Sequence, residues 1–91
     1  MAKICKRVFY EGRVQGVGFR YSVRQLACGY DISGTVQNLA DGRVALVIEG
    51  QERETEDFLQ GIRESALAGH IKTENSEICP LQGLLSFQII A

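Results

Sequence analysis

The dipeptide Asp41-Gly42 stands between two segments in which apolar and polar residues alternate, and it constrains the fold more than any other feature. The first segment runs from Ile32 to Leu39 and the second from Arg43 to Gly50. Asp-Gly between alternating segments is a strong β-hairpin signal, because glycine readily adopts the positive φ that a tight turn needs. The sequence therefore predicts two antiparallel strands at its centre.

Further elements are predicted on both sides of this hairpin. Residues 4–12 are rich in β-branched and aromatic side chains, and residues 19–30 carry apolar side chains at helical spacing. Residues 52–65 begin with acidic side chains, which favour a helix N-terminus. Strands are expected within residues 71–78 and 84–90. Up to residues 71–78 the order of the elements is βαββαβ, which predicts an α+β, ferredoxin-like two-layer sandwich, with both helices on one face of an antiparallel sheet.

The length and charge of the chain narrow the functional classes. Its 91 residues, 45% of them hydrophobic, suit a single domain over residues 1–91. Ten basic against eleven acidic residues give a net charge of −1, which argues against a nucleic-acid partner. No apolar run approaches membrane-spanning length, and residues 1–7 lack the apolar block of a secretory signal. We therefore expect a cytoplasmic protein with no membrane association.

Three widely spaced cysteines, Cys5, Cys28 and Cys79, form no CxxC motif. Free thiols in a reducing compartment are the simpler interpretation. A bridge between Cys5 and Cys79 remains an alternative if the two ends of the chain lie side by side. No cluster of histidine, cysteine and carboxylate residues has the spacing of metal ligands, so no metal and no cofactor is expected.

The most informative stretch runs from Gly12 to Arg20 and joins the first predicted strand to the first helix. Glycines in such a loop let backbone N–H groups turn inward, and the following helix N-terminus favours an anion. Arg20 lies in the first helical turn, where its guanidinium can bind two oxygens of one phosphate. The alternative is a tight loop whose arginine forms a surface salt bridge.

Asn38 is the second candidate, at the end of the strand before the hairpin turn. Its amide offers both a donor and an acceptor, which suits the orientation of a water molecule. The alternative is that Asn38 caps the turn, as asparagine often does. Asp41 and Gly42 are interpreted as turn residues, and the only histidine, His70, as a surface residue without a catalytic role.

Taken together, the segments 12–20 and 34–44 resemble the two signatures of the acylphosphatase family, in the right order and spacing. The resemblance implies hydrolysis of an acyl phosphate to a carboxylate and inorganic phosphate, without metal or covalent intermediate. It implies that Arg20 and the backbone amides of residues 15–20 bind the phosphoryl group, and that Asn38 positions the attacking water. The amides are those of Gln15, Gly16, Val17, Gly18, Phe19 and Arg20.

Two other functions stay open on the sequence alone. A domain of this fold can bind phosphate or carbamoyl phosphate without turnover, because a fold does not determine an activity. An RNA-binding or dimeric regulatory domain of the same architecture is the third possibility, which the charge and the missing aromatic RNA-binding pattern oppose. We expect a monomeric enzyme whose acyl phosphate is a small molecule.

Overall fold

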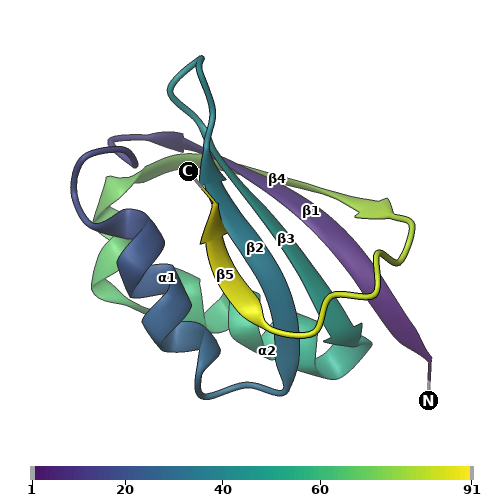
Figure 1. Cartoon of the computed structure of the whole chain (residues 1–91). Helices are drawn as coiled ribbons and strands as arrows, with labels where there is room; N and C mark the ends of the chain where they lie inside the picture. Colours follow the sequence, from purple (N-terminus) through teal and green to yellow (C-terminus); the bar gives the residue numbers. More distant parts are fainter. Residues whose placement is uncertain (1, 91) are drawn as a thin grey trace.

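The computed structural model describes residues 2–90 and consists of one sheet, two α-helices and a short 3₁₀ helix (Figure 1). No helix among the described residues is long and apolar enough to cross a membrane. In chain order the elements are β1 (Lys3–Gly12), α1 (Phe19–Ala27), β2 (Ile32–Asn38), β3 (Val44–Gln51), α2 (Glu52–Arg63), the 3₁₀ helix η1 (Ala66–His70), β4 (Ile71–Cys79) and β5 (Phe87–Ile90).

The sheet has the strand order β4-β1-β3-β2-β5. The predicted hairpin is confirmed, since β2 and β3 pair antiparallel with Asn38 opposite Val44. β1 lies between β3 and β4 and is antiparallel to both. The predicted ferredoxin-like fold is therefore confirmed. The strand expected within residues 84–90 forms β5, but it pairs with the other side of β2 in parallel, whereas the prediction was an antiparallel sheet.

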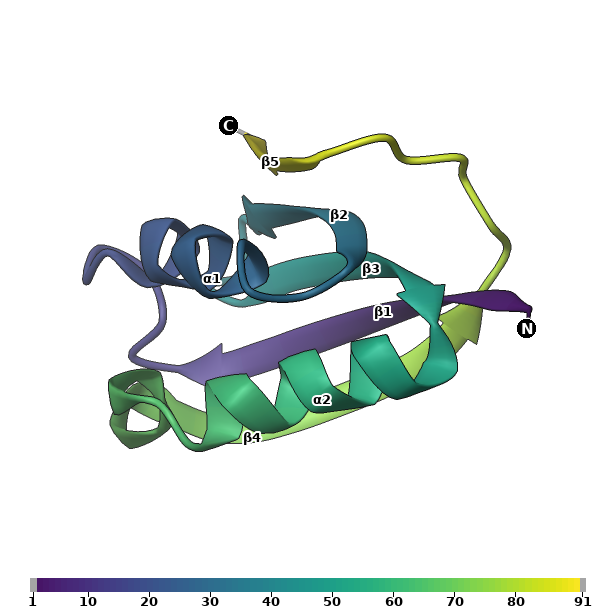
Figure 2. The ribbon, with the colours of Figure 1, turned by 90° about the horizontal axis from the view of Figure 1, so that it is seen from below.

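One face of the sheet and the two helices enclose the core (Figure 2). Alternation along β1 places Val8 and Tyr10 in this core, because successive side chains of a strand point to opposite faces. The helices contribute apolar side chains at helical spacing, as predicted. The fully buried members with the largest side chains are Tyr10, Phe19, Phe58, Leu46, Ile48, Leu59 and Ile62.

Three predicted boundaries extend two or three residues too far. α1 ends at Ala27 rather than Tyr30, because the following N–H groups bond to carbonyls three residues back and tighten the chain into turns. α2 ends at Arg63 rather than at residue 65. The last strand begins at Phe87 rather than at residue 84, because the preceding backbone bonds to a side chain of β3 instead of to a strand.

That side chain is Glu49, which anchors residues 80–86, named here the crossing segment. The crossing segment leads from β4 at one edge of the sheet to β5 at the other edge (Figure 1). Glu49 is only 4% exposed, and its carboxylate accepts hydrogen bonds from the N–H groups of Gln82 and Leu84. Burial opposes the charged form, but these backbone hydrogen bonds outweigh it and hold the pKa of Glu49 below its ordinary value.

Candidate active site

The loop between β1 and α1 forms an open bend of backbone. Gly16 and Gly18 have φ angles of 77° and 76°, a conformation that other residues rarely adopt. A side-chain carbon at either glycine would meet nothing within 4 Å, so the space above the loop is open. Gly18 is also the N-cap of α1, which leaves the first backbone N–H groups of the helix without intrahelical partners. The loop and the first turn of α1 together present backbone N–H donors to the open space above the loop.

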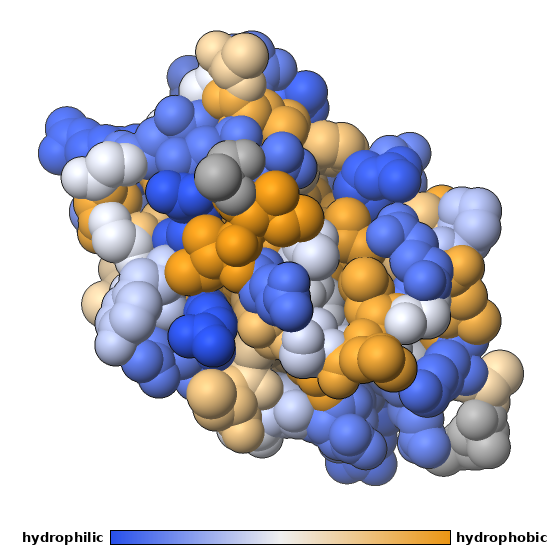
Figure 3. All heavy atoms as spheres, viewed as in Figure 1, coloured by the Kyte–Doolittle hydropathy of each residue, from blue (hydrophilic) through white to orange (hydrophobic). Residues whose placement is uncertain are grey.

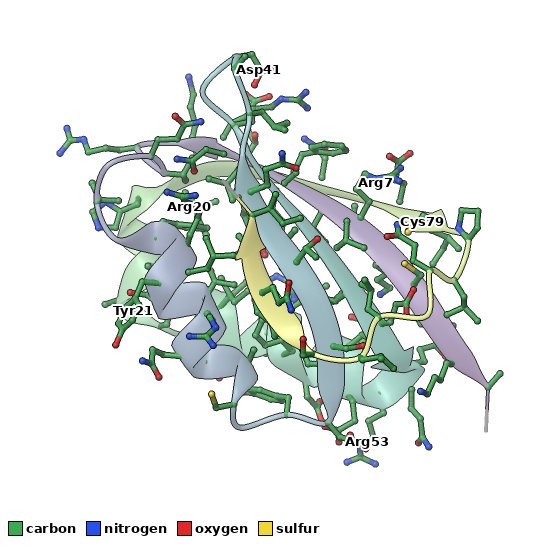
Figure 4. The ribbon with its side chains drawn as sticks, viewed as in Figure 1. Arg7, Arg20, Tyr21, Asp41, Arg53 and Cys79 are labelled. Atoms are coloured by element: carbon green, nitrogen blue, oxygen red, sulfur yellow. The ribbon has the colours of Figure 1, made fainter. Side chains whose placement is uncertain are left out.

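Arg20 projects from the first turn of α1 (Figure 4). One of its terminal nitrogens, Nη1, donates to the backbone carbonyl of Ile90 in β5 over 3.1 Å. None of the ion pairs found among residues 2–90 includes Arg20. Ile90 therefore holds one edge of the guanidinium, and the remaining N–H donors stay available to an anion.

Gln15 links this loop to the β2–β3 hairpin, a contact that the sequence did not predict. Its side-chain nitrogen Nε2 donates to the carbonyl of Leu39 over 2.8 Å and to that of Arg43 over 2.9 Å. These two carbonyls lie on either side of the hairpin turn, where the N–H of Leu39 also bonds to the carbonyl of Arg43. Gln15 thus fixes the loop against the end of β2, where Asn38 lies.

Asn38 is the last residue of β2 and is half-buried. Its side-chain oxygen Oδ1 is fully buried and has no hydrogen-bond partner among residues 2–90. Buried polar atoms are normally paired, and leaving one unpaired costs about 1–3 kcal/mol. The turn residues satisfy their own backbone, since Asp41 accepts from the N–H of Arg43. An unpaired acceptor at this position is available to a water molecule or a ligand that enters the site.

Both candidates line one small cavity of about 180 Å³. Five of the predicted site residues contribute to it, namely Gly16, Gly18, Phe19, Arg20 and Asn38. Gln15 and Val17 do not line this cavity, which is completed by Val14, Tyr21 and Ile89. Ile89 escaped prediction because it reaches the site through the pairing of β5 with β2, and no local motif signals that pairing.

The charge of the lining favours an anion. Among the described residues that line this cavity, Arg20 is the only charged one, and none carries a carboxylate. Figure 3 shows hydrophobic surface over β5 directly beside the hydrophilic surface of the loop and α1. A larger open cavity of about 520 Å³ lies beside the hairpin, but the one cation among its described residues, Arg43, is paired with Asp41, and the carboxylate of Glu11 makes its lining less favourable to a dianion. Among residues 2–90 no group of three or more histidine, cysteine and acidic residues is placed to hold a metal ion.

Comparison with known proteins agrees with this geometry. The model of the acylphosphatase family matches residues 6–89. The chain is 38% identical over 87 residues to an acylphosphatase of Pseudomonas paraeruginosa, covering 96% of each chain.

Solved structures give the same result. The acylphosphatase of Bacillus subtilis superposes with a TM-score of 0.87 at 31% identity, covering 97% of this chain and 99% of the other. The full-length protein HypF, solved with phosphate and nucleotide bound, contains a similar region with a TM-score of 0.90 at 27% identity. That region covers 99% of this chain and 12% of HypF.

Proposed function

The chain belongs to the acylphosphatase family, whose members hydrolyse acyl phosphates to a carboxylate and inorganic phosphate, and from this premise we propose which of its residues carry the reaction. The backbone amides of residues 15–20 and the guanidinium of Arg20 bind the phosphoryl group. Asn38 orients the attacking water. The observation that carries the proposal is that Asn38, whose Oδ1 is buried without a hydrogen-bond partner, lines the same cavity as Arg20.

The phosphate site is supported by two independent sources of positive potential. The N-terminus of α1 contributes unpaired N–H groups and the favourable end of its dipole. Arg20 contributes a full charge and a planar set of donors, already oriented by the carbonyl of Ile90. The volume of about 180 Å³ is below the usual range for sites of drug-sized ligands, which begins at roughly 300 Å³. It suits a phosphoryl group whose acyl portion extends outside.

Asn38 has the right chemistry for the water. Its Oδ1 can accept a hydrogen bond from the water molecule, and its amide N–H₂ can donate a hydrogen bond to a phosphate oxygen. The oxygen of the water then attacks phosphorus, and the bond from phosphorus to the acyl oxygen breaks. The carboxylate leaves with the bonding electron pair. We propose that a phosphate oxygen of the substrate takes the proton of the water, so that no separate general base is required.

These interactions can account for catalysis because the reaction is intrinsically favourable. A carboxylate is a good leaving group and needs no protonation. The transition state of phosphoryl transfer is loose and spreads its charge over the phosphate oxygens, so positioning and electrostatic stabilisation lower most of the barrier. Donors fixed before the reaction are the most effective kind. The contacts of Gln15 and Ile90 fix the two halves of this site in that way.

The test is the hydrolysis of benzoyl phosphate by the wild type and by Arg20→Ala and Arg20→Lys, with a chelator present. We expect Arg20→Ala to lower kcat/KM by about 10³-fold and to abolish competitive inhibition by inorganic phosphate. Arg20→Lys keeps the charge but loses the planar donor set, so only part of the activity returns. Arg53→Ala is the matched control, since Arg53 is 88% exposed on α2 (Figure 4). Full activity in Arg20→Ala would refute the assignment.

The second function is a phosphate- or carbamoyl phosphate-binding module, and the resemblance to a region of HypF, a protein solved with phosphate bound, supports the binding of phosphate. The same assay separates the two functions. A chain that binds phosphate competitively but does not turn over benzoyl phosphate is a binding module, and its partner is a protein.

We further propose that residues 1–91 act as one domain, as a cytoplasmic monomer without a nucleic-acid partner or metal. The net charge of −1 supports the absence of nucleic acid.

A further inference from the structure

Two buried cysteines face each other on neighbouring strands, far from the active site. Cys5 of β1 and Cys79 of β4 are directly opposite in the antiparallel register. Their Sγ atoms are 2.8 Å apart, and the side chains are 1% and 7% exposed. Opposite residues of an antiparallel pair have Cα atoms about 4.5–5.5 Å apart, within the range that a disulfide spans. The backbone therefore needs no movement to accommodate a bridge.

We propose that Cys5 and Cys79 form a reversible dithiol–disulfide pair, which closes by exchange with a small-molecule disulfide. Cys79 attacks one sulfur of that disulfide as the thiolate, and the first small thiol leaves. Cys5 then attacks Sγ of Cys79, and the second small thiol leaves. Two electrons pass from the protein to the reagent, and the protons of the two cysteines appear on the two released thiols.

The surroundings of the pair determine this order of attack. Cys79 ends β4 and is followed by the crossing segment, so a brief opening of that segment exposes it (Figure 4). Cys5 lies beneath, between Cys79 on β4 and Glu49 on β3. Burial, followed by the contacts with Cys79 and Glu49, raises the pKa of Cys5 to about 12 and keeps it a neutral thiol. The first attack therefore falls to Cys79.

The bridge fixes the start of the crossing segment. Four strand spacings of about 4.8 Å separate β4 from β5 across the sheet, or about 19 Å. The chain from Cys79 to Phe87 reaches only about 26 Å when fully extended. The segment must therefore span most of its full reach, and it leads to β5, where the carbonyl of Ile90 accepts from Arg20. A fixed Cys79 consequently helps to keep β5 beside the active site as the temperature rises.

The experiment uses the full chain with Cys28→Ser, which removes the exposed third thiol. The folded, reduced protein is incubated with oxidised glutathione, and its intact mass and linked peptides are measured. We expect the loss of two hydrogens and a peptide that joins Cys5 to Cys79. Adding Cys5→Ser should leave a mixed disulfide trapped on Cys79, whereas adding Cys79→Ser should leave Cys5 unmodified.

The consequence is measured by thermal unfolding. Because the bridge closes a long loop, it should raise the unfolding temperature by about 10 °C or more, and a reductant should reverse the rise. Hydrolysis of benzoyl phosphate at 25 °C should change less than twofold, because the strand register is unchanged. The proposal is overturned if the folded protein keeps its full reduced mass while an unfolded sample oxidises in the same mixture. A bridge without the reversible thermal shift also overturns it.

Discussion

Replacing Asn38 by alanine should separate stability from activity. The Oδ1 atom of Asn38 is buried and has no hydrogen-bond partner among residues 2–90. An unpaired buried acceptor costs about 1–3 kcal/mol, and alanine removes it at the loss of a little packing. We therefore expect Asn38→Ala to be as stable as the wild type or up to about 1 kcal/mol more stable. That gain corresponds to an unfolding temperature about 4–8 °C higher.

Turnover should change in the opposite direction. Loss of one positioned polar group in a site of this kind typically costs about 10²–10³ in kcat, which is about 2.7–4 kcal/mol of transition-state stabilisation. KM should change little, because the amides of residues 15–20 and Arg20 still bind the phosphoryl group. Steady-state hydrolysis of benzoyl phosphate and thermal unfolding, measured on the same preparation, give both quantities.

Gln37→Ala is the matched control, because it removes a neighbouring amide of β2 that lies outside the cavity. It should keep normal kcat. The reasoning is refuted if Asn38→Ala loses about 1 kcal/mol of stability and retains kcat. That result would show that Asn38 caps the hairpin turn, the alternative that the sequence left open.

Three further perturbations follow from contacts seen in the structure. Gln15→Ala should lower kcat/KM about tenfold or more while phosphate inhibition persists, because the loop loses its two bonds to the hairpin; unchanged kinetics would contradict this. Glu49 has a lowered pKa, so its contribution to stability is complete above pH 4.5, the ordinary value, and is lost as the pH falls through the lower folded value. Near neutral pH, Glu49→Gln should therefore be less stable than the wild type. In acid unfolding curves it should lose less of its stability than the wild type does below pH 4.5. Gly61→Ala should destabilise by about 1–3 kcal/mol in denaturant titrations despite the better helix propensity of alanine, because its methyl group would collide with the hydroxyl of Tyr30; a stabilised variant would contradict this.

The parts of the fold that were predicted correctly are those with a local cause. Asp41 and Gly42 specify the hairpin through turn geometry, and Gly42 has the expected positive φ of 95°. Arg20 and Asn38 became candidates because each follows a local pattern, a glycine-rich entry to a helix and an amide before a turn, and because the two segments together resemble the acylphosphatase signatures; their roles stay predictions. Their position in one cavity follows from the order of the elements, which the alternation of apolar residues sets.

The parts that were missed depend on contacts between distant segments. The parallel pairing of β5 with β2 has no turn to announce it, and its first hydrogen bond joins Gly34 to the carbonyl of Ser86. The role of Ile90 follows from this pairing alone. The two bonds of Gln15 cross 24 and 28 residues, so a polar loop side chain offered no sign of them. The last strand begins later than predicted because the backbone N–H of Leu84 donates to the carboxylate of Glu49 and not to a neighbouring strand.

These distant contacts explain how so few functional groups can suffice. Arg20 and Asn38 lie on different elements, and neither would be placed accurately by its own element alone. Gln15 ties the phosphate loop to the hairpin that carries Asn38, and Ile90 holds the guanidinium of Arg20 from the opposite side. The site is therefore organised before substrate arrives, and little reorganisation is needed when charge develops on the phosphate oxygens. Since a carboxylate leaves readily, the proposed roles of a fixed cation, fixed amides and one oriented water would form a chemically complete set for acyl phosphate hydrolysis.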